Sequence, residues 1–146
     1  MSNQTIKRVR GTMIIVGCGR LGANVANMFS TAGMEVVIID KLKTAFNKLP
    51  SSYSGFQIEA DASDIHALED AGVQKAGAVF VVTGDDNINI MVSEIAKVIY
   101  EIPTVVTRLY DTEKESLLKD SGIEVIYPAK LEIDAFRELF GAVSEE

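Results

Sequence analysis

Three glycines spaced Gly-x-Gly-x-x-Gly, at Gly17, Gly19 and Gly22, form the pattern in this sequence that most clearly indicates chemistry. They directly follow the apolar run 13–16 and open a segment with helical spacing. The first glycine permits a tight turn, the second lets phosphates approach the backbone, and the third allows a helix to pack closely on a strand. The free N–H groups and dipole of that helix then stabilise an anion. We therefore predict a diphosphate-binding turn, with a purely structural turn as the alternative.

The side chains within this loop refine the prediction. Arg20 stands where its guanidinium can reach a pyrophosphate or a terminal phosphate, unless it is simply a solvent-exposed arginine on the first helical turn. Cys18 is predicted to pack rather than to react, because no histidine lies near it in the sequence. Leu21 completes the loop. We count all of residues 17–22 as cofactor-binding positions.

A carboxylate ends the next apolar run, about 20 residues after the loop, as dinucleotide-binding folds require. Asp40 can accept hydrogen bonds from both ribose hydroxyls, and its charge repels a 2'-phosphate. This favours NAD(H), ATP, ADP or AMP over NADP. Lys41 follows it and slightly weakens that exclusion. The alternative is that Asp40 caps a helix that starts near Lys43.

The elements that position these residues are short Val- and Ile-rich runs separated by helix-length segments. This pattern is typical of a buried parallel sheet with crossover helices. Strands are predicted at 12–17, 35–40, 55–59, 78–83, 104–108 and 124–127, and helices at 20–33, 43–49, 64–71, 86–100, 113–121 and 129–141. The alternation predicts an α/β fold: a Rossmann-like, doubly wound, mostly parallel six-stranded sheet in the order 3-2-1-4-5-6. Ligands of such sheets bind outside the carboxyl ends of strands 1 and 4.

Two of the predicted helices carry further signals. The helix near 20–33 should end at Gly33, a left-handed cap, and should pack through its apolar residues Leu21, Val25, Met28 and Phe29. The helix near 86–100 should begin at an aspartate cap, either Asp85 or Asp86. Its large apolar residues are predicted to share one broad face against the sheet: Ile88, Met91, Val92, Ile95, Val98 and Ile99.

Composition excludes several classes of function. The formal net charge of −7 repels phosphate backbones and anionic lipid headgroups, so we expect no nucleic-acid binding. One cysteine and the lack of a signal-peptide pattern at the N-terminus predict a cytoplasmic protein. No apolar run approaches the roughly 20 residues that span a bilayer, so a role at the inner face of the membrane would need a partner. His66, the only histidine, lacks acidic or thiol partners at ligand spacing, so no metal site is predicted.

Taken together, the motifs of the chain resemble RCK N-terminal domains, also called TrkA-N domains. These are cytoplasmic regulatory subunits of Trk and Ktr type potassium transporters. The resemblance covers about residues 12–141. The motifs that carry it, in order, are the loop 17–22, Ile38-Ile39-Asp40, Glu59-Ala60-Asp61-Ala62-Ser63, the stretch 82–89 (Val-Thr-Gly-Asp-Asp-Asn-Ile-Asn), Thr107-Arg108-Leu109-Tyr110-Asp111 and Ile126-Tyr127-Pro128-Ala129.

The resemblance implies that Gly17, Gly19, Arg20 and Gly22 bind the phosphates, and that Asp40 binds the ribose. It also implies that the Asp61-Ala62 pair lies against the adenine. From the residues alone, the alternative is that Asp61 caps the helix near residue 64.

Further site residues are expected at the ends of strands 4 and 5. Thr83 and Gly84 should end the fourth strand and give the crevice a small polar lining. Asp85 and Asp86 either hold a cation beside the phosphates, or one of them caps the following helix while the other is solvated. Arg108 either neutralises phosphate charge or pairs with an acidic neighbour.

The last predicted helix carries Phe136, Leu139 and Phe140 beyond what six strands should cover, which indicates an interface. The resemblance implies that this helix crosses to a neighbouring subunit and builds a homodimer or higher ring through residues 129–141; packing back on its own domain is the alternative. We expect a leader at 1–11, a nucleotide-binding domain at 12–128, and an interface helix and tail at 129–146. Family members usually continue into an RCK C-terminal domain, so the expectation here is either that this domain is a separate partner protein or that the chain is truncated.

The sequence therefore favours a non-enzymatic regulatory subunit that senses a nucleotide and transmits a conformational change to a membrane-embedded potassium channel or transporter. An NAD-dependent oxidoreductase subunit is the alternative, and it would need a partner to supply the substrate site. A redox-sensing transcription factor is a third interpretation, which the acidic composition disfavours.

Overall fold

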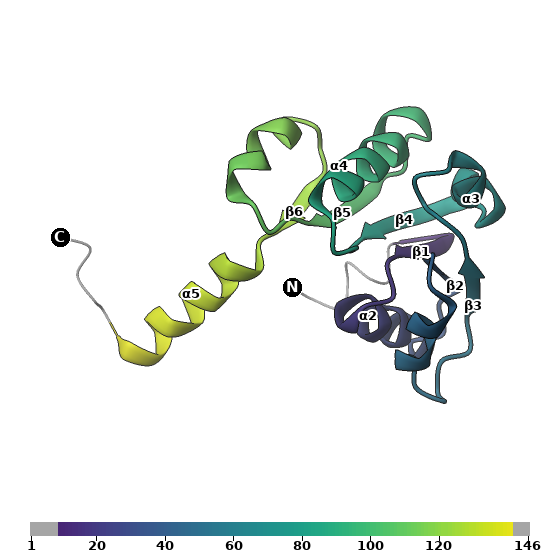
Figure 1. The fold of residues 1–146 in the computed structure, drawn as a ribbon, viewed down its shortest axis with the longest axis horizontal. Helices are drawn as coiled ribbons and strands as arrows, with labels where there is room; N and C mark the ends of the chain where they lie inside the picture. The colour runs from purple at the N-terminus through teal and green to yellow at the C-terminus, as the bar shows by residue number, and fades with distance from the viewer. Residues whose placement is uncertain (1–8, 142–146) are drawn as a thin grey trace.

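Six short strands form one sheet in the order β3-β2-β1-β4-β5-β6 (Figure 1). This computed structural model describes residues 9–141. The strands are β1 (Thr12–Val16), β2 (Val36–Asp40), β3 (Phe56–Glu59), β4 (Ala76–Val81), β5 (Thr104–Arg108) and β6 (Glu124–Ile126). Every neighbouring pair is parallel. The predicted Rossmann-like fold and strand order are confirmed, and the winding reverses between β1 and β4.

Helices of three kinds connect the strands or follow the last one. The α-helices are α2 (Arg20–Thr31), α3 (Ile65–Asp70), α4 (Asp86–Glu94) and α5 (Pro128–Phe140). The 3-10 helices are η1 (Lys43–Lys48), η2 (Val73–Lys75) and η4 (Thr112–Leu118), and a π-helical turn, η3 (Ile95–Ile99), extends α4. The segments predicted as helices near 43–49 and 113–121 are thus 3-10 helices, a form that proteins use in short pieces.

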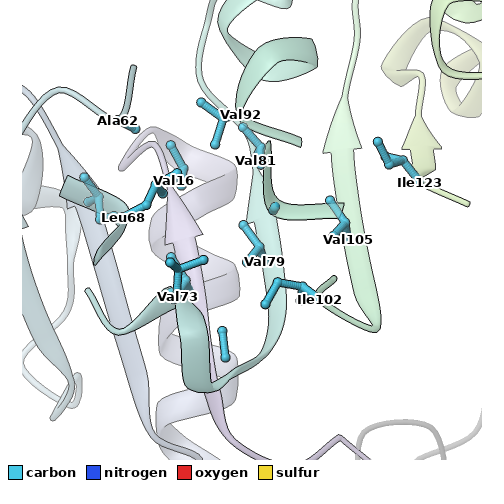
Figure 2. Close-up of a cluster of buried hydrophobic side chains, with 14 of the residues drawn as sticks. Val16, Ala62, Leu68, Val73, Val79, Val81, Val92, Ile102, Val105 and Ile123 are labelled. Atoms are coloured by element: carbon cyan, nitrogen blue, oxygen red, sulfur yellow. The ribbon is translucent and has the colours of Figure 1, made fainter. Parts of the chain in front are cut away.

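The central strands β1, β2 and β4 are buried on both faces of the sheet, toward which their successive residues point in turn. Ile14 and Val16 lie in one hydrophobic cluster, whereas Met13 and Ile15 lie in the other. Side chains of α3 and α4 cover the first face, and side chains of α2 and η1 cover the second. Figure 2 shows the first cluster, with Val79 in its centre. This double burial explains why the strands lack the alternation of polar and apolar residues.

The buried face of α4 and η3 matches the predicted apolar face only in part: Val92 is buried and Ile88 and Ile95 pack against the first hydrophobic cluster, but the other predicted residues are exposed. The residues buried against the sheet are smaller or polar: Asn89, Val92, Ser93 and Ala96. Met91, Val98 and Ile99 are instead 37%, 71% and 61% exposed. Small side chains let the helix approach the sheet closely, and the wider π turn changes the direction of the residues that follow Glu94. On α2, Met28 is also exposed, against the prediction.

The ends of several elements bear on the site. Thr83 and Gly84 were predicted to end the fourth strand. β4 instead ends at Val81, so both residues lie in the loop that follows it. β4 also starts before the predicted position, where Gly77 allows close approach: a Cβ there would lie 1.9 Å from the Arg10 carbonyl oxygen. Gly33 follows α2 with φ +84°, as the predicted left-handed cap requires.

The C-terminal helix α5 extends away from the sheet (Figure 1), and none of its residues is buried. The alternative that it packs back on its own domain is therefore wrong. Within residues 9–141, no helix is both long and apolar enough to cross a bilayer. Residues 1–8 of the predicted leader and residues 142–146 of the predicted tail lie outside the described part of the chain.

Candidate functional site

The turn between β1 and α2 is sharp because two of its glycines have no room for a side chain. Gly17 has φ +105°, and a Cβ there would lie 2.9 Å from the Thr83 nitrogen. A Cβ on Gly22 would lie 1.8 Å from the carbonyl oxygen of Gly17. The fold itself therefore requires these two glycines: one for the turn, the other for the close packing of α2 on that turn.

Gly19 is a glycine for which the fold gives no such reason. Its φ of −82° is accessible to any residue, and a Cβ there would meet nothing within 4 Å. The effect of glycine at this position is to leave the outer surface of the loop bare. Backbone N–H groups can then be approached by an atom from outside the protein.

The N-terminus of α2 also lacks a side-chain cap. Its N-cap residue is Gly19, which makes no side-chain hydrogen bond, and its first turn holds no acidic residue. By contrast, α3, α4 and η4 begin at Asp64, Asp85 and Asp111, whose carboxylates accept N–H groups of their own helices. The start of α2 thus combines N–H groups without a side-chain cap with the positive end of the helix dipole. The exposed side chain of Arg20 belongs to this first turn.

Asp40, at the end of β2, faces the glycine loop. Its Oδ2 accepts a hydrogen bond from the Cys18 nitrogen at 2.8 Å, and its Oδ1 accepts one from the Leu42 nitrogen at 2.8 Å. Each carboxylate oxygen keeps a further lone pair. η1 begins at its N-cap Leu42 without a side-chain cap, so the alternative of Asp40 as the helix cap is wrong. Asp40 instead joins the turns after β1 and β2.

Cys18 is a packing residue, as predicted. Its side chain is fully buried, and its Sγ donates to the carbonyl oxygen of Ala45 at 3.4 Å. Burial is the main cause that raises the pKa of the Cys18 thiol, and the negative charge of Asp40 raises it further. The reactive thiolate is therefore disfavoured at neutral pH.

Asp61 follows β3, one strand beyond Asp40. Its Oδ1 accepts from the backbone nitrogen and from the hydroxyl of Ser63, at 2.9 and 2.7 Å, and these hydrogen bonds lower the pKa of the carboxyl. α3 is capped by Asp64, so the alternative of Asp61 as the helix cap is wrong. Ala62 is buried against the first hydrophobic cluster.

The loop after β4 is held by a residue that the sequence analysis did not select. Asn89 of α4 is fully buried, and its Oδ1 accepts from the nitrogen and the hydroxyl of Thr83 at 3.0 and 2.5 Å. Its Nδ2 donates to the carbonyl oxygens of Thr83 and Arg108 at 3.1 and 2.8 Å. The spacing of Asn89 with Val92 and Ala96 on one face is the signal that would have identified it.

Charged residues complete this side of the site. Asp85 accepts from the nitrogens of Asn87 and Ile88, so it is the predicted cap of α4. Asp86 instead accepts from two backbone nitrogens of the loop after β5, those of Tyr110 and Asp111. The two aspartates therefore have separate structural roles.

Among residues 9–141, no acidic neighbour pairs with Arg108 at the end of β5, contrary to one of its two predicted roles. Its Nη2 donates to the carbonyl oxygens of Val82 and Thr83 at 3.0 and 3.2 Å. Its guanidinium lies 4.9 Å from the centre of the Tyr110 ring. The positive charge is thus held behind the loop after β4.

The predicted site residues come together at one edge of the sheet, because the carboxyl ends of parallel strands lie on the same side. They follow β1, β2, β3, β4 and β5, and the glycine loop adjoins the point where the winding reverses. The fold and this edge define a domain of the Rossmann type, the class in which ligands bind at such a switch point.

The chain belongs to the TrkA-N domain family, which matches it over residues 13–128. A Trk system potassium uptake protein TrkA of Streptomyces coelicolor is 32% identical over 114 residues, which are 78% of this chain and 51% of the relative. A TrkA homolog of Pyrococcus horikoshii is 32% identical over 108 residues, 74% of this chain and 47% of the relative. The chain thus spans about half the length of these curated relatives.

Solved structures share the fold. The TrkA-N domain of the inner membrane protein ybaL from Escherichia coli superposes with a TM-score of 0.80 at 13% identity, covering 92% of this chain and 99% of that one. The GsuK channel bound to NAD superposes with a TM-score of 0.74 at 22% identity, covering 89% of this chain and 23% of that one. The AMP-bound Kef C-terminal domain of Shewanella denitrificans superposes with a TM-score of 0.69 at 23% identity, covering 90% of this chain and 83% of that one.

Proposed function

We propose that this chain is the nucleotide-sensing domain of a regulatory subunit of a potassium channel or transporter, and that it binds NAD(H) or an adenine nucleotide. The observation that carries the proposal is the bare loop at Gly19, beside the start of α2, which has no side-chain cap, and within reach of the Asp40 carboxylate. The names of the TrkA relatives support the transport role, and the NAD and AMP bound to the GsuK and Kef structures support the ligand class.

In this proposal the phosphates bind over residues 17–22, where α2 supplies N–H groups and Arg20 supplies positive charge. The Asp40 carboxylate uses its remaining lone pairs for the ribose hydroxyls, beside Lys41. Asp61 and Ala62 lie on the adenine side, after the neighbouring strand β3. Residues 83–85 line the opposite side, after β4, and Arg108 at the end of β5 contributes positive charge from behind this loop.

We propose sensing rather than turnover as the activity. Ligands that differ at the phosphates shift a conformational equilibrium only by their difference in affinity for the two states. Arg20 and the start of α2 are the groups that would detect the difference, because both contribute positive charge at the phosphates.

We propose further that residues 12–128 form the sensor, and that residues 129–146 form an assembly segment that joins two copies into a homodimer or ring. On α5 the exposed fractions of Phe136, Leu139 and Phe140 are 63%, 80% and 72%, and the rings of Phe136 and Phe140 stack at 6.2 Å. A helix of 13 residues with no buried side chain gains little stability alone. Phe136, Leu139 and Phe140 form an apolar stripe, and a second copy that covers this stripe would bury these side chains.

The proposed membrane partner is the pore-forming subunit of the potassium system, and an RCK C-terminal domain is a further candidate partner. The chain would then act at the cytoplasmic face of the inner membrane through that subunit. The negative net charge agrees with a contact through protein rather than through anionic lipid.

The ligand is tested by mass spectrometry of any nucleotide that co-purifies, followed by calorimetric titration with NAD, NADH, ATP, ADP and AMP, with NADP as the comparison. We expect binding of at least one of the first five and weaker binding of NADP. Absence of binding for all five would refute the proposed function. Turnover of NADH with a panel of carbonyl substrates would instead favour an oxidoreductase.

The assembly role is tested by measuring molar mass with analytical ultracentrifugation. Phe136→Glu places a charge in the apolar stripe and should yield monomers, whereas Glu138→Gln on the opposite side of α5 should not change the mass. A wild-type protein that is monomeric at all concentrations would contradict the role of α5.

A further inference from the structure

The buried amide of Asn89 makes more contacts with one short loop than packing alone explains. Resting on the proposed function, we propose that Asn89 is a positioning residue of the nucleotide site: it fixes Thr83, which together with Val82 forms the backbone against which the glycine loop is seated, and so sets the affinity for the nucleotide.

The hydrogen-bonding capacity of the Asn89 side chain is fully used. Both donors of its Nδ2 are occupied, by the carbonyl oxygens of Thr83 and Arg108, and its Oδ1 accepts two hydrogen bonds from Thr83. Three of the four contacts therefore fix a single residue, and the fourth ties that residue to the end of β5. Such a satisfied network in a buried place specifies one local geometry.

The attachment of α4 to the sheet does not rest on this amide alone. Val92 and Ala96 of the same face are buried in the first hydrophobic cluster. Ser93, four residues after Asn89, is equally buried, yet its hydroxyl has no hydrogen-bond partner among the described residues. The helix thus packs without polar contacts at Ser93, and the polar contacts at Asn89 serve the loop.

The loop that Asn89 holds supports the glycine turn. Gly17 packs against the backbone of Val82 and Thr83. A Cβ added to Gly17 would lie 2.9 Å from backbone atoms of both residues. The Val82 side chain lies 3.3 Å from the corresponding position of Gly22. A shift of Val82 or Thr83 therefore moves the surface against which both glycines pack. Arg108 also donates hydrogen bonds to the carbonyl oxygens of these two residues.

The experiment compares Asn89→Ala with the matched control Ser93→Ala, a truncation at equal burial on the same helix. Calorimetry with ADP and with NAD measures affinity, and site-resolved amide exchange by NMR measures the loop. The Thr83 N–H should lose its protection in Asn89→Ala, because its acceptor is Asn89 Oδ1. The N–H groups of Gly17 and Val82, which donate to Ile39 and Val16, should keep theirs. Affinity should fall about tenfold, a change of about 1.4 kcal/mol.

A second variant, Asn89→Asp, keeps the acceptor oxygen and loses both donors. It should protect the Thr83 N–H better than Asn89→Ala does and should still bind nucleotide more weakly than wild type. This variant carries the test if Asn89→Ala does not fold. Ser93→Ala should match wild type in affinity and in exchange.

Three results would overturn the inference. They are wild-type affinity in Asn89→Ala, an equal loss of affinity in Ser93→Ala, and a joint loss of protection at Gly17, Val82 and Thr83, which would indicate general destabilisation. If the wild-type protein binds neither ADP nor NAD, nor any other nucleotide of the series, the proposed function fails first, and that outcome is distinct from these three.

Discussion

A comparison of the variants Gly22→Ala and Gly19→Ala distinguishes a glycine that the fold requires from a glycine that the ligand requires. In Gly22→Ala the new Cβ would lie 1.8 Å from the Gly17 carbonyl oxygen and 2.9 Å from its carbon, whereas ordinary contact begins at 3.4 Å. Both obstacles are backbone atoms, so no side-chain rotation relieves the clash, and α2 must move away from the turn.

The expected cost follows from the rigidity of these neighbours. Overpacking of a well-packed region costs about 1–3 kcal/mol, and a clash with backbone belongs at the upper end, about 3 kcal/mol. For a chain of this size each kcal/mol lowers the melting temperature by roughly 2–4 °C, so we expect a decrease of about 6–12 °C. Gly19→Ala meets no atom within 4 Å and should cost less than about 1 kcal/mol, mainly because alanine is a poor N-cap.

The assay is thermal and urea unfolding of both variants, monitored by far-ultraviolet circular dichroism, with nucleotide affinity measured on the same preparations. Gly22→Ala should lose stability, and Gly19→Ala should lose affinity with little loss of stability. Equal stability of the two variants would refute the close packing of α2 on the turn described above.

Three further predictions concern individual side chains. Asp40→Ala should lower stability by about 1–3 kcal/mol in urea unfolding, because two backbone N–H groups lose a charged acceptor; an unchanged midpoint would argue against these contacts. Cys18 should react with iodoacetamide at pH 8 far more slowly in the folded protein than in urea, since burial raises its pKa; equal rates would contradict its burial. Burial raises the pKa of Tyr53 to about 12, above the ordinary value of 10.0, so the folded state retains this proton longer than the unfolded state. The stability linked to this protonated phenol is therefore present below pH 10 and is lost as the pH rises toward 12. The check is an absorbance titration at 295 nm of wild type and Tyr53→Phe, whose difference gives the titration of Tyr53. A midpoint of that difference near pH 10 would contradict the raised pKa.

The features that were predictable from the sequence are those that depend on local pattern. The alternation of apolar runs and helix-length segments gave the six strands, and the glycine spacing placed the turn at Gly17 and the start of α2. Asp40 was predictable as well, because a carboxylate at the end of the second strand must lie beside the end of the first once β1 and β2 are parallel neighbours.

The features that escaped prediction depend on tertiary packing. Hydrophobicity selected Met91 and Val98 for the buried face of the fourth helix, but the sheet instead accepts small residues and Asn89. An asparagine inside a helix is equally compatible with a solvent-exposed position, so its role is visible only when Thr83 and Arg108 are placed around it. The role of Arg108 depended in the same way on which carbonyl groups of the neighbouring loop lay within reach.

The central claim is that Gly19 leaves a bare surface on which nucleotide phosphates bind. Calorimetric titration of Gly19→Asp with ADP and NAD tests it, with Asn24→Asp as the control that adds the same charge on the exposed side of α2, one turn further along. We predict that affinity falls about a hundredfold or more in Gly19→Asp, because like charges placed together cost several kcal/mol, and that Asn24→Asp binds within a few fold of wild type. Wild-type affinity in a folded Gly19→Asp protein would contradict the account.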